Sequence, residues 1–163
     1  MPVSPTFDSA KYRQVLGHFP TGVTVITAAA DDGVPVGLAV GSFTSVSLEP
    51  PLVAFFPGKG SSSWPKIEAI GAFCVNILAE AQEDVSRRFA SKDEEKFTGL
   101  GWTATASGAP LIDGVLAWID CDIDSVTDAG DHLCVMGRVK ELEVSHDGAP
   151  LVFFRGGYGR FTV

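Results

Sequence analysis

The sequence is short of basic residues, and those it has are unevenly placed. Twelve Lys and Arg face 20 Asp and Glu, which gives a formal net charge of -8 over 163 residues. No Lys or Arg occurs between Lys96 and Arg138, whereas six of the 12 lie between Lys59 and Lys96. A nucleic-acid binder needs a basic surface to neutralise phosphates, so this balance argues against one. We expect an anionic ligand to be held locally, by the segment from Lys59 to Lys96.

Long apolar runs, paired cysteines and a dinucleotide-binding glycine motif are also missing. No apolar run reaches the roughly 20 residues that cross a bilayer, and the start of the chain lacks the blocks of a signal peptide. We therefore expect a cytoplasmic protein without membrane association. Cys74, Cys121 and Cys134 form no CxxC pair, which predicts buried apolar thiols and no metal site. No GxGxxG follows a strand, so a Rossmann domain is not expected.

What the chain does contain is a series of strand signals with short helices between them, among 18 glycines and 10 prolines. Caps and apolar spacing predict helices from Asp8 or Ser9 to Pro20, from Ser62 or Ser63 to Gly71, and over 78–89. Strands are expected at 21–27, along the glycine-rich stretch from 37, and at 52–56, 73–78, 115–126, 133–144 and 151–154. This order predicts one mainly β, barrel-like domain and not alternating βαβ units.

The strand at 115–126 has the clearest alternation in the chain. Its apolar positions are Ile119, Cys121 and Ile123, and its acidic positions are Asp120, Asp122 and Asp124. Because successive side chains of a strand point to opposite faces, we expect the first set to be buried and the second to face water.

The stretch from Val36 to Pro51, VGLAVGSFTSVSLEPP, is the most informative segment. Glycine and small side chains let a ligand approach backbone amides. Hydroxyls and free amides suit a flat heterocycle that carries carbonyls and ring nitrogens, and the two prolines stiffen the segment. The alternative is an ordinary barrel strand whose glycines serve bends.

Two segments gather positive charge. In 59–63, KGSSS, successive hydroxyls and amides at a predicted helix start can bind an anion, although an ordinary capped helix would look the same. In 87–97, the candidates for a phosphate contact are Arg88, Lys92 and Lys96. Phe89 would then lie against the ligand. The alternative is a solvated helix end with ion pairs four residues apart.

The remaining candidates lie near the C-terminus. Gly130-Asp131-His132 follows a predicted turn, and its histidine could bond a nicotinamide amide or a diphosphate, assist proton transfer, or be structural. In the tail 154–161, FRGGYGRF, Tyr158 offers a stacking face and Arg155 a phosphate partner. The alternative there is a frayed terminal strand.

The order of these segments resembles the flavin reductase family, the small reductase components of two-component monooxygenases. The resemblance runs roughly from residue 10 to the end, and it rests on 19–27, 37–53, 59–63, 73–78, Phe89-Ala90 with Lys96-Phe97, Gly130-Asp131-His132 and 155–160. It implies a six-stranded Greek-key split β-barrel with two or three short helices, which spans 1–163 as a single domain and forms a homodimer.

The resemblance also implies the ligands. FMN or FAD would lie along Leu38 to Ser45, with its phosphate near Ser61, Ser63 and Lys96. NADH or NADPH would stack on the flavin and pass hydride from nicotinamide C4 to flavin N5, a step that needs no acid–base pair of the protein. The reduced flavin would serve a partner monooxygenase. The implied cofactor-binding residues are Leu38, Ala39, Val40, Ser42, Phe43, Thr44, Ser45, Ser61, Ser62, Ser63, Asn76, Arg88, Phe89, Lys96, His132, Arg155 and Tyr158, with His132 also catalytic and no metal ligand.

Two other functions remain open at this point. The first is a flavin-binding or flavin-storage module without turnover, and Gly-Asp-His argues for the enzyme because a pure binder needs no nicotinamide site. The second is a split-barrel oxidase of a pyridoxal-type amine. That activity would require a denser set of Arg and Lys for the substrate phosphate than this sequence offers.

Overall fold

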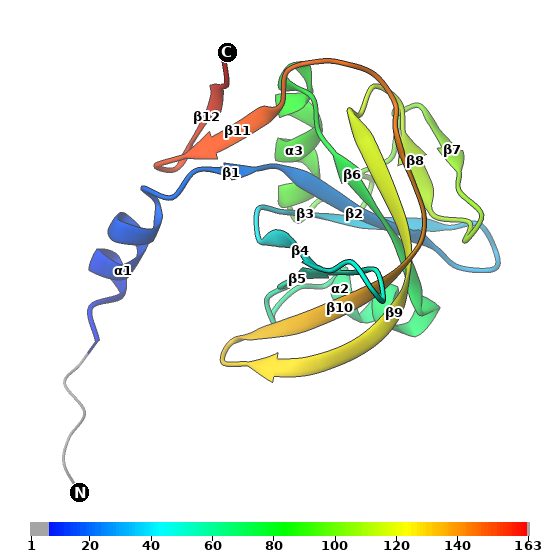
Figure 1. The fold of residues 1–163 in the computed structure, drawn as a ribbon, viewed down its shortest axis with the longest axis horizontal. Helices are drawn as coiled ribbons and strands as arrows, with labels where there is room; N and C mark the ends of the chain where they lie inside the picture. Colours follow the sequence, from blue (N-terminus) through cyan, green and yellow to red (C-terminus); the bar gives the residue numbers. More distant parts are fainter. Residues whose placement is uncertain (1–6, 163) are drawn as a thin grey trace, which may run out of the picture.

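The protein is a mainly β chain with three short α-helices, described here by a computed structural model over residues 7–162 (Figure 1). The helices are α1 (Ser9–Leu16), α2 (Trp64–Ile70) and α3 (Glu83–Ala90), with a 3₁₀ turn η1 (Glu80–Gln82) before α3. The strands are β1 (Thr21–Gly22), β2 (Thr24–Ala29), β3 (Pro35–Val40), β4 (Phe43–Ser47), β5 (Leu52–Phe55), β6 (Ala72–Ile77), β7 (Trp102–Ala104), β8 (Pro110–Ile112), β9 (Ala117–Ala129), β10 (His132–Val144), β11 (Leu151–Phe154) and β12 (Gly157–Arg160). Among residues 7–162, no helix is long and apolar enough to span a membrane.

The main sheet has seven strands in the order β3-β2-β6-β9-β10-β5-β4, and all its neighbours are antiparallel. Its two edge strands, β3 and β4, are joined only by Gly41 and Ser42, so the sheet curves until its edges approach each other. Within residues 7–162 these two strands do not pair, so the sheet stays open along this seam and forms no closed barrel. The expectation of a mainly β fold is confirmed, but the main sheet holds seven strands and not six. Two small sheets, β1-β11-β12 and β7-β8, complete the fold.

The core has two parts because strands of the main sheet are covered on both faces. In the first part, Phe55 packs edge-to-face on Trp64 of α2 and on Phe73 of β6, with ring centroids 5.7 and 5.0 Å apart. In the second, Phe89 of α3 packs with Leu78 and neighbouring apolar side chains. All residues of β2 except the last are buried, and its two threonines satisfy their hydroxyls by donating to the carbonyls of Val40 and Pro110.

The start of α1 and the end of α2 lie where local signals placed them, whereas α1 ends at Leu16, before the predicted end at Pro20, because Gly17 forms its C-cap. The Asp8 carboxylate accepts hydrogen bonds from the N–H groups of Ala10 and Lys11 and so caps α1. Gly71 ends α2 in the left-handed region, at φ 83°. The predicted third helix instead divides into η1 and the shorter α3.

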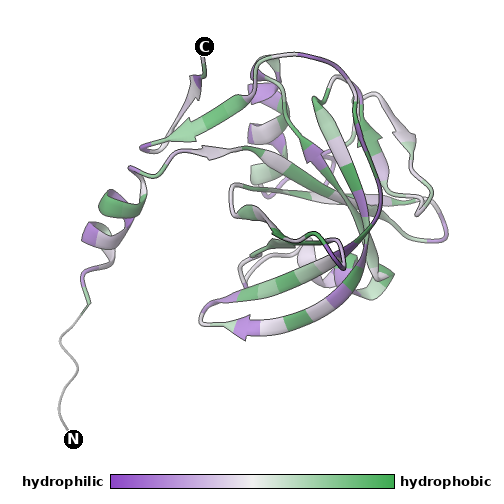
Figure 2. Cartoon of the chain, viewed as in Figure 1, coloured by the Kyte–Doolittle hydropathy of each residue, from purple (hydrophilic) through white to green (hydrophobic). Residues whose placement is uncertain are grey.

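Strand β9 confirms its predicted alternation at Cys121, which is buried, and at Asp124, which is exposed, whereas Ile119, Ile123 and Asp122 are half-buried. Colours change from residue to residue along it in Figure 2, and Cys121 is fully buried. Asp120, however, is buried rather than wet, because its carboxylate accepts hydrogen bonds from the Thr105 hydroxyl and from the Ser107 hydroxyl and N–H. These bonds fasten the β7–β8 hairpin, which the sequence pattern did not predict. Burial raises the pKa of Cys121 to about 12, so this thiol stays protonated, as expected of an apolar core residue.

Candidate functional site

A cavity of about 760 Å³ opens between the β2–β3 hairpin, the start of α2 and the loop 91–97 after α3, and we call it the lysine cavity. Its cationic and hydroxyl-bearing lining residues are Ser62, Ser63, Lys66, Lys92 and Lys96. Its acidic lining residues are Asp31, Asp32, Asp93 and Glu94. The lysines and serines form a donor set suited to a phosphate, whereas the carboxylates keep the site from being an open basic patch.

Lys96 is held in this cavity by two backbone carbonyls. Its Nζ donates to the oxygen of Gly37 at 3.3 Å and to that of Phe89 at 3.2 Å. An ammonium has three donors, so one N–H remains for a ligand. Burial lowers the pKa of Lys96, the attraction of Asp93 opposes that shift, and the nearby charge of Lys66 adds to it.

Gly37 makes this arrangement possible because a side chain there would collide with α3. A Cβ at position 37 would lie 2.7 Å from the ring of Phe89 and 3.1 Å from the carbonyl oxygen of Ile26. Strand β3 can therefore pass close to α3, and its carbonyl comes within reach of Lys96. The glycine-rich character of the segment thus has a local packing cause at this position.

Two predicted ligand contacts, Arg88 on the phosphate and Phe89 against the ligand, make contacts within the protein. The guanidinium of Arg88 donates to the carbonyl oxygens of Thr98, at 2.8 Å, and Lys96, at 3.4 Å, and so closes the loop after α3. Phe89 is only 2% exposed and packs edge-to-face on Phe97, with centroids 4.9 Å apart. Neither residue lines the lysine cavity.

The serine loop divides into two roles. The Oγ of Ser61 accepts a hydrogen bond from the N–H of Trp64 at 3.2 Å, so it caps the start of α2, and Ser61 does not line the cavity. Ser63 occupies the N-cap position without a side-chain cap bond, and it lines the cavity together with Ser62. The hydroxyls placed to meet an anion are therefore those of Ser62 and Ser63.

A second cavity, also of about 760 Å³, lies beside the β3–β4 connection and the end of α1, and we call it the apolar groove. Its lining comes from the end of α1, β1, the start of β2, Gly41–Thr44, Phe56, Ile77 and Phe153. It contains the predicted flavin contacts Ser42, Phe43 and Thr44. The Ser42 hydroxyl is already engaged, because it donates to the carbonyl of Phe56 at 3.2 Å and accepts from its N–H at 3.3 Å.

The side chains of the other residues in the predicted flavin segment point partly into the core and partly to the surface. Leu38 and Val40 are each 8% exposed and belong to the core. Ala39 packs against the second part of the core, and Ser45 is exposed on β4. A ligand along this segment would therefore meet backbone more than the side chains of Leu38 and Val40.

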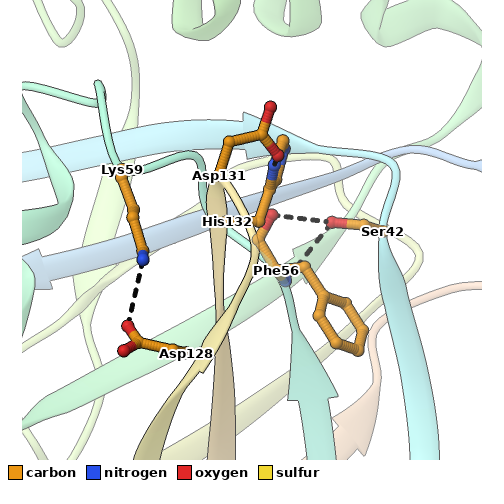
Figure 3. A network of polar contacts seen from close by, with 6 residues as sticks. All are labelled: Ser42, Phe56, Lys59, Asp128, Asp131 and His132. Carbon is orange, nitrogen blue, oxygen red and sulfur yellow. Dashed lines mark hydrogen bonds and ion pairs between the residues drawn. The ribbon is translucent and has the colours of Figure 1, made fainter. Parts of the chain in front are cut away.

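His132 lies at the tip of the β9–β10 hairpin, beside the segment that follows β5 (Figure 3). Its Nδ1 is 2.8 Å from Oδ1 of Asp131, and its side chain is 51% exposed. Lys59 forms an ion pair of 3.1 Å with Asp128 of the same hairpin. Among residues 7–162, no cluster of three or more His, Cys, Asp or Glu side chains is arranged to hold a metal ion.

Tyr158 and Arg155 form a separate group on the small C-terminal sheet. The Tyr158 hydroxyl is 2.7 Å from that of Ser86, and the guanidinium of Arg87 lies 4.9 Å from the tyrosine ring centroid. Arg155 lies in the β11–β12 turn with φ 53°, and its guanidinium stacks on Phe154. The structure thus does not bring these residues to the lysine cavity.

The side chain of Asn76 is buried and hydrogen-bonded within the single chain. It is 0% exposed, and its amide bonds the carbonyls of Val25 and Pro110, the Thr27 hydroxyl and the N–H of Ile112. No face of the side chain is left for a ligand, so the structure gives Asn76 a packing role in place of the binding role that the resemblance implied.

Comparison with known proteins shows which family this chain is related to. A model of the flavin reductase like domain matches residues 16–162. The chain belongs to the flavin reductase-like family. A flavin reductase of Pseudomonas putida is 56% identical over 160 residues, which cover 98% of this chain and 94% of that protein. The reductase subunit HsaB of a flavin-dependent monooxygenase from Rhodococcus jostii is 52% identical, over 93% of this chain and 77% of that protein.

A solved flavin reductase-like structure carries ligands. It is the NADH:FAD oxidoreductase SgcE6 of Streptomyces globisporus in complex with NAD and FAD fragments. It is 36% identical, covers 99% of this chain and 97% of its own, and superposes with a TM-score of 0.90. The family that the sequence suggested is therefore confirmed.

Some residues that line the lysine cavity of this flavin reductase-like protein were not predicted from its sequence. Lys66 lines the lysine cavity beside Ser63, and Asp31 and Asp32 line it from the hairpin. The signal for Lys66 was its spacing of three residues from Ser63, which places both on one helix face. The run Asp31-Asp32-Gly33 is typical of a hairpin turn, and nothing local indicated that this hairpin reaches α2.

Proposed function

We propose that this protein is an NAD(P)H-dependent flavin reductase that reduces FMN or FAD and supplies the reduced flavin to a partner monooxygenase. The observation that carries the proposal is the lysine cavity, whose donors Ser62, Ser63 and Lys96 adjoin the glycine-rich strand β3. That donor set fits the phosphate of a flavin nucleotide. The names of similar proteins, a flavin reductase and a monooxygenase reductase subunit, support the same activity.

The residues have separate tasks in this proposal. Ser62, Ser63 and Lys96 hold the phosphate, and the backbone of β3 and β4 lies along the ring. The bound flavin and nicotinamide would themselves supply the hydride-transfer chemistry. His132 binds the nicotinamide and orients it. Holding the two rings in contact makes the transfer effectively unimolecular.

We further propose that the protein works as a cytoplasmic homodimer. The support for a dimer is the apolar surface of α1 and its flanks, where Tyr12, Val15, Leu16 and Phe19 are all exposed in the single chain. This surface borders the apolar groove, whose walls include Leu16 and Phe19. A second copy that covered it would bury a contiguous apolar patch beside the flavin segment.

The assay for this function mixes the purified protein with FMN or FAD and with NADH or NADPH. We expect the absorbance of the reduced nicotinamide to fall at a rate proportional to protein concentration. A flavin-storage module would bind flavin without accelerating this loss, so binding without turnover would overturn the proposal in favour of that alternative.

Replacing His132 with alanine should lower kcat/KM for NADH by about fivefold while flavin affinity stays nearly unchanged. The reason is that removing one hydrogen-bonding partner of a ligand costs on the order of 1 kcal/mol. Steady-state rates and flavin titration measure the two quantities. His146→Ala is the matched control, because that ring bonds the Gly114 carbonyl elsewhere in the fold. Equal losses of flavin affinity and turnover would contradict the assigned role.

A further inference from the structure

The side chains of Asp131 and His132 form a hydrogen-bonded pair at the β9–β10 tip. Oδ1 of Asp131 lies 2.8 Å from Nδ1 of His132. An ionised carboxylate can only accept, so the proton of this bond resides on Nδ1. The bond from His132 holds the pKa of Asp131 below its usual value, which keeps the carboxylate ionised. In the neutral ring, Nε2 therefore carries a free lone pair.

The backbone around this pair is fixed while both side chains stay accessible. The N–H of Lys59 donates to the Asp131 carbonyl at 2.9 Å, and Gly58 forms an isolated β-bridge with His132. The side chains of His132 and Asp131 are nevertheless 51% and 95% exposed. Residue 58 lacks a side chain, and a Cβ there would lie 3.8 Å from Nε2. The segment thus supports the ring without covering its Nε2 edge.

We propose that Asp131 is a positioning residue that holds His132 in its Nδ1–H form, so that Nε2 accepts a hydrogen bond from the carboxamide NH₂ of the reduced nicotinamide. This inference rests on the proposed function. A carboxamide offers both a donor and an acceptor, and a ring with a defined tautomer selects one of them. A diphosphate has no hydrogen to give, so a neutral His132 in this form binds the amide and not the diphosphate.

The first test reads the ring directly. In protein labelled at histidine, nitrogen-15 NMR of wild type should show the proton of neutral His132 on Nδ1. Asp131→Ala should lose this signature, and both ring nitrogens should move towards the averaged shifts of a free imidazole. Asp128→Ala makes the same charge change on the same hairpin without contact to His132, and it should leave the ring signals unchanged. An unaltered tautomer in Asp131→Ala would overturn the proposal.

The second test separates binding from turnover. Asp131→Ala should raise KM for NADH about threefold at constant kcat, because a contact made equally in ground and transition state is weakened. Asp131→Asn keeps an oxygen that can accept from Nδ1, so it should retain most of the affinity and the wild-type tautomer. If Asp131→Ala changed kcat alone, or if Asp131→Asn were as impaired as Asp131→Ala, the proposal would fail.

The two tests also distinguish this inference from the proposed function. Should wild type not oxidise NADH at all, the proposed function fails whatever the ring signals show. Should wild type turn over normally while Asp131→Ala keeps both its tautomer and its KM, the reductase assignment stands and the positioning role of Asp131 fails.

Discussion

Replacing Asn76 with alanine is expected to lower the free energy of unfolding by about 3 to 5 kcal/mol. The amide is fully buried and makes four hydrogen bonds, to the carbonyls of Val25 and Pro110, the hydroxyl of Thr27 and the N–H of Ile112. Without it, these buried groups each lose a partner, although the Thr27 hydroxyl still donates to the Pro110 carbonyl, and each group left unsatisfied costs about 1 to 3 kcal/mol. Urea unfolding followed by tryptophan fluorescence measures the change.

The control for this prediction lies on the hairpin that Asn76 holds. Thr103 is exposed on β7, and Thr103→Val should change stability by no more than about 0.5 kcal/mol. Flavin affinity of the folded fraction of Asn76→Ala should match wild type. A fully stable Asn76→Ala with lost flavin binding would restore the ligand role and contradict the packing role.

Replacing Lys96 with alanine is expected to weaken FMN binding by about 10- to 100-fold. A hydrogen bond to a charged group contributes roughly 1.5 to 3 kcal/mol, which corresponds to that change in affinity. Isothermal titration with FMN and with riboflavin measures it, and riboflavin affinity should change little because riboflavin has no phosphate. Lys92→Ala removes the same charge from an exposed position of the same cavity and should weaken FMN binding less than about threefold.

The affinity for FMN should also depend on pH through Lys96. Because burial lowers its pKa, the ammonium loses its proton at a lower pH than an ordinary lysine does. FMN affinity should therefore decline as pH rises, before ordinary lysines deprotonate, and this decline should be absent in Lys96→Ala. Equal FMN affinity and equal pH profiles of Lys96→Ala and wild type would remove Lys96 from the phosphate site.

The elements that depend on local signals were predictable from the sequence. Asp8 caps α1, Gly33 turns the β2–β3 hairpin at φ 81°, and Gly71 ends α2. Each depends on a residue's own conformational preference or on a hydrogen bond to a neighbour in the chain. Such preferences act over a few positions and need no knowledge of tertiary structure.

Features that depend on distant pairing were not predictable in this way. Asp120 has the pattern of a solvated strand position, yet Thr105 and Ser107 of a separate hairpin bury it. The sequence pattern also placed β3 and β4 in one glycine-rich strand, because the short edge strand β4 follows β3 after only two residues and reads as its continuation. Alternation reports which side chains share a face, not which strand lies next to them.

The candidate site shows the same difference between what local chemistry indicates and what distant contacts decide. Lys96 and Ser63 were chosen for charge and cap chemistry, and both line the lysine cavity. Arg88 was chosen for its charge, and it bonds the backbone of its own loop. A sequence shows which side chains can bind phosphate, but a neighbouring carbonyl can occupy the same donors, and only the folded chain determines which of them remain free.

The pairing of β1 with β11 affects the order in which the chain folds. Thr21 pairs with Phe153, so this small sheet joins segments roughly 130 residues apart. Contacts of such separation close late and slow the folding of β proteins. During translation, the first strand must wait until residue 160 has left the ribosome before β11 and β12 can form beside it. We therefore expect a nascent chain to complete its seven-stranded sheet first and to anchor β1 against β11 last.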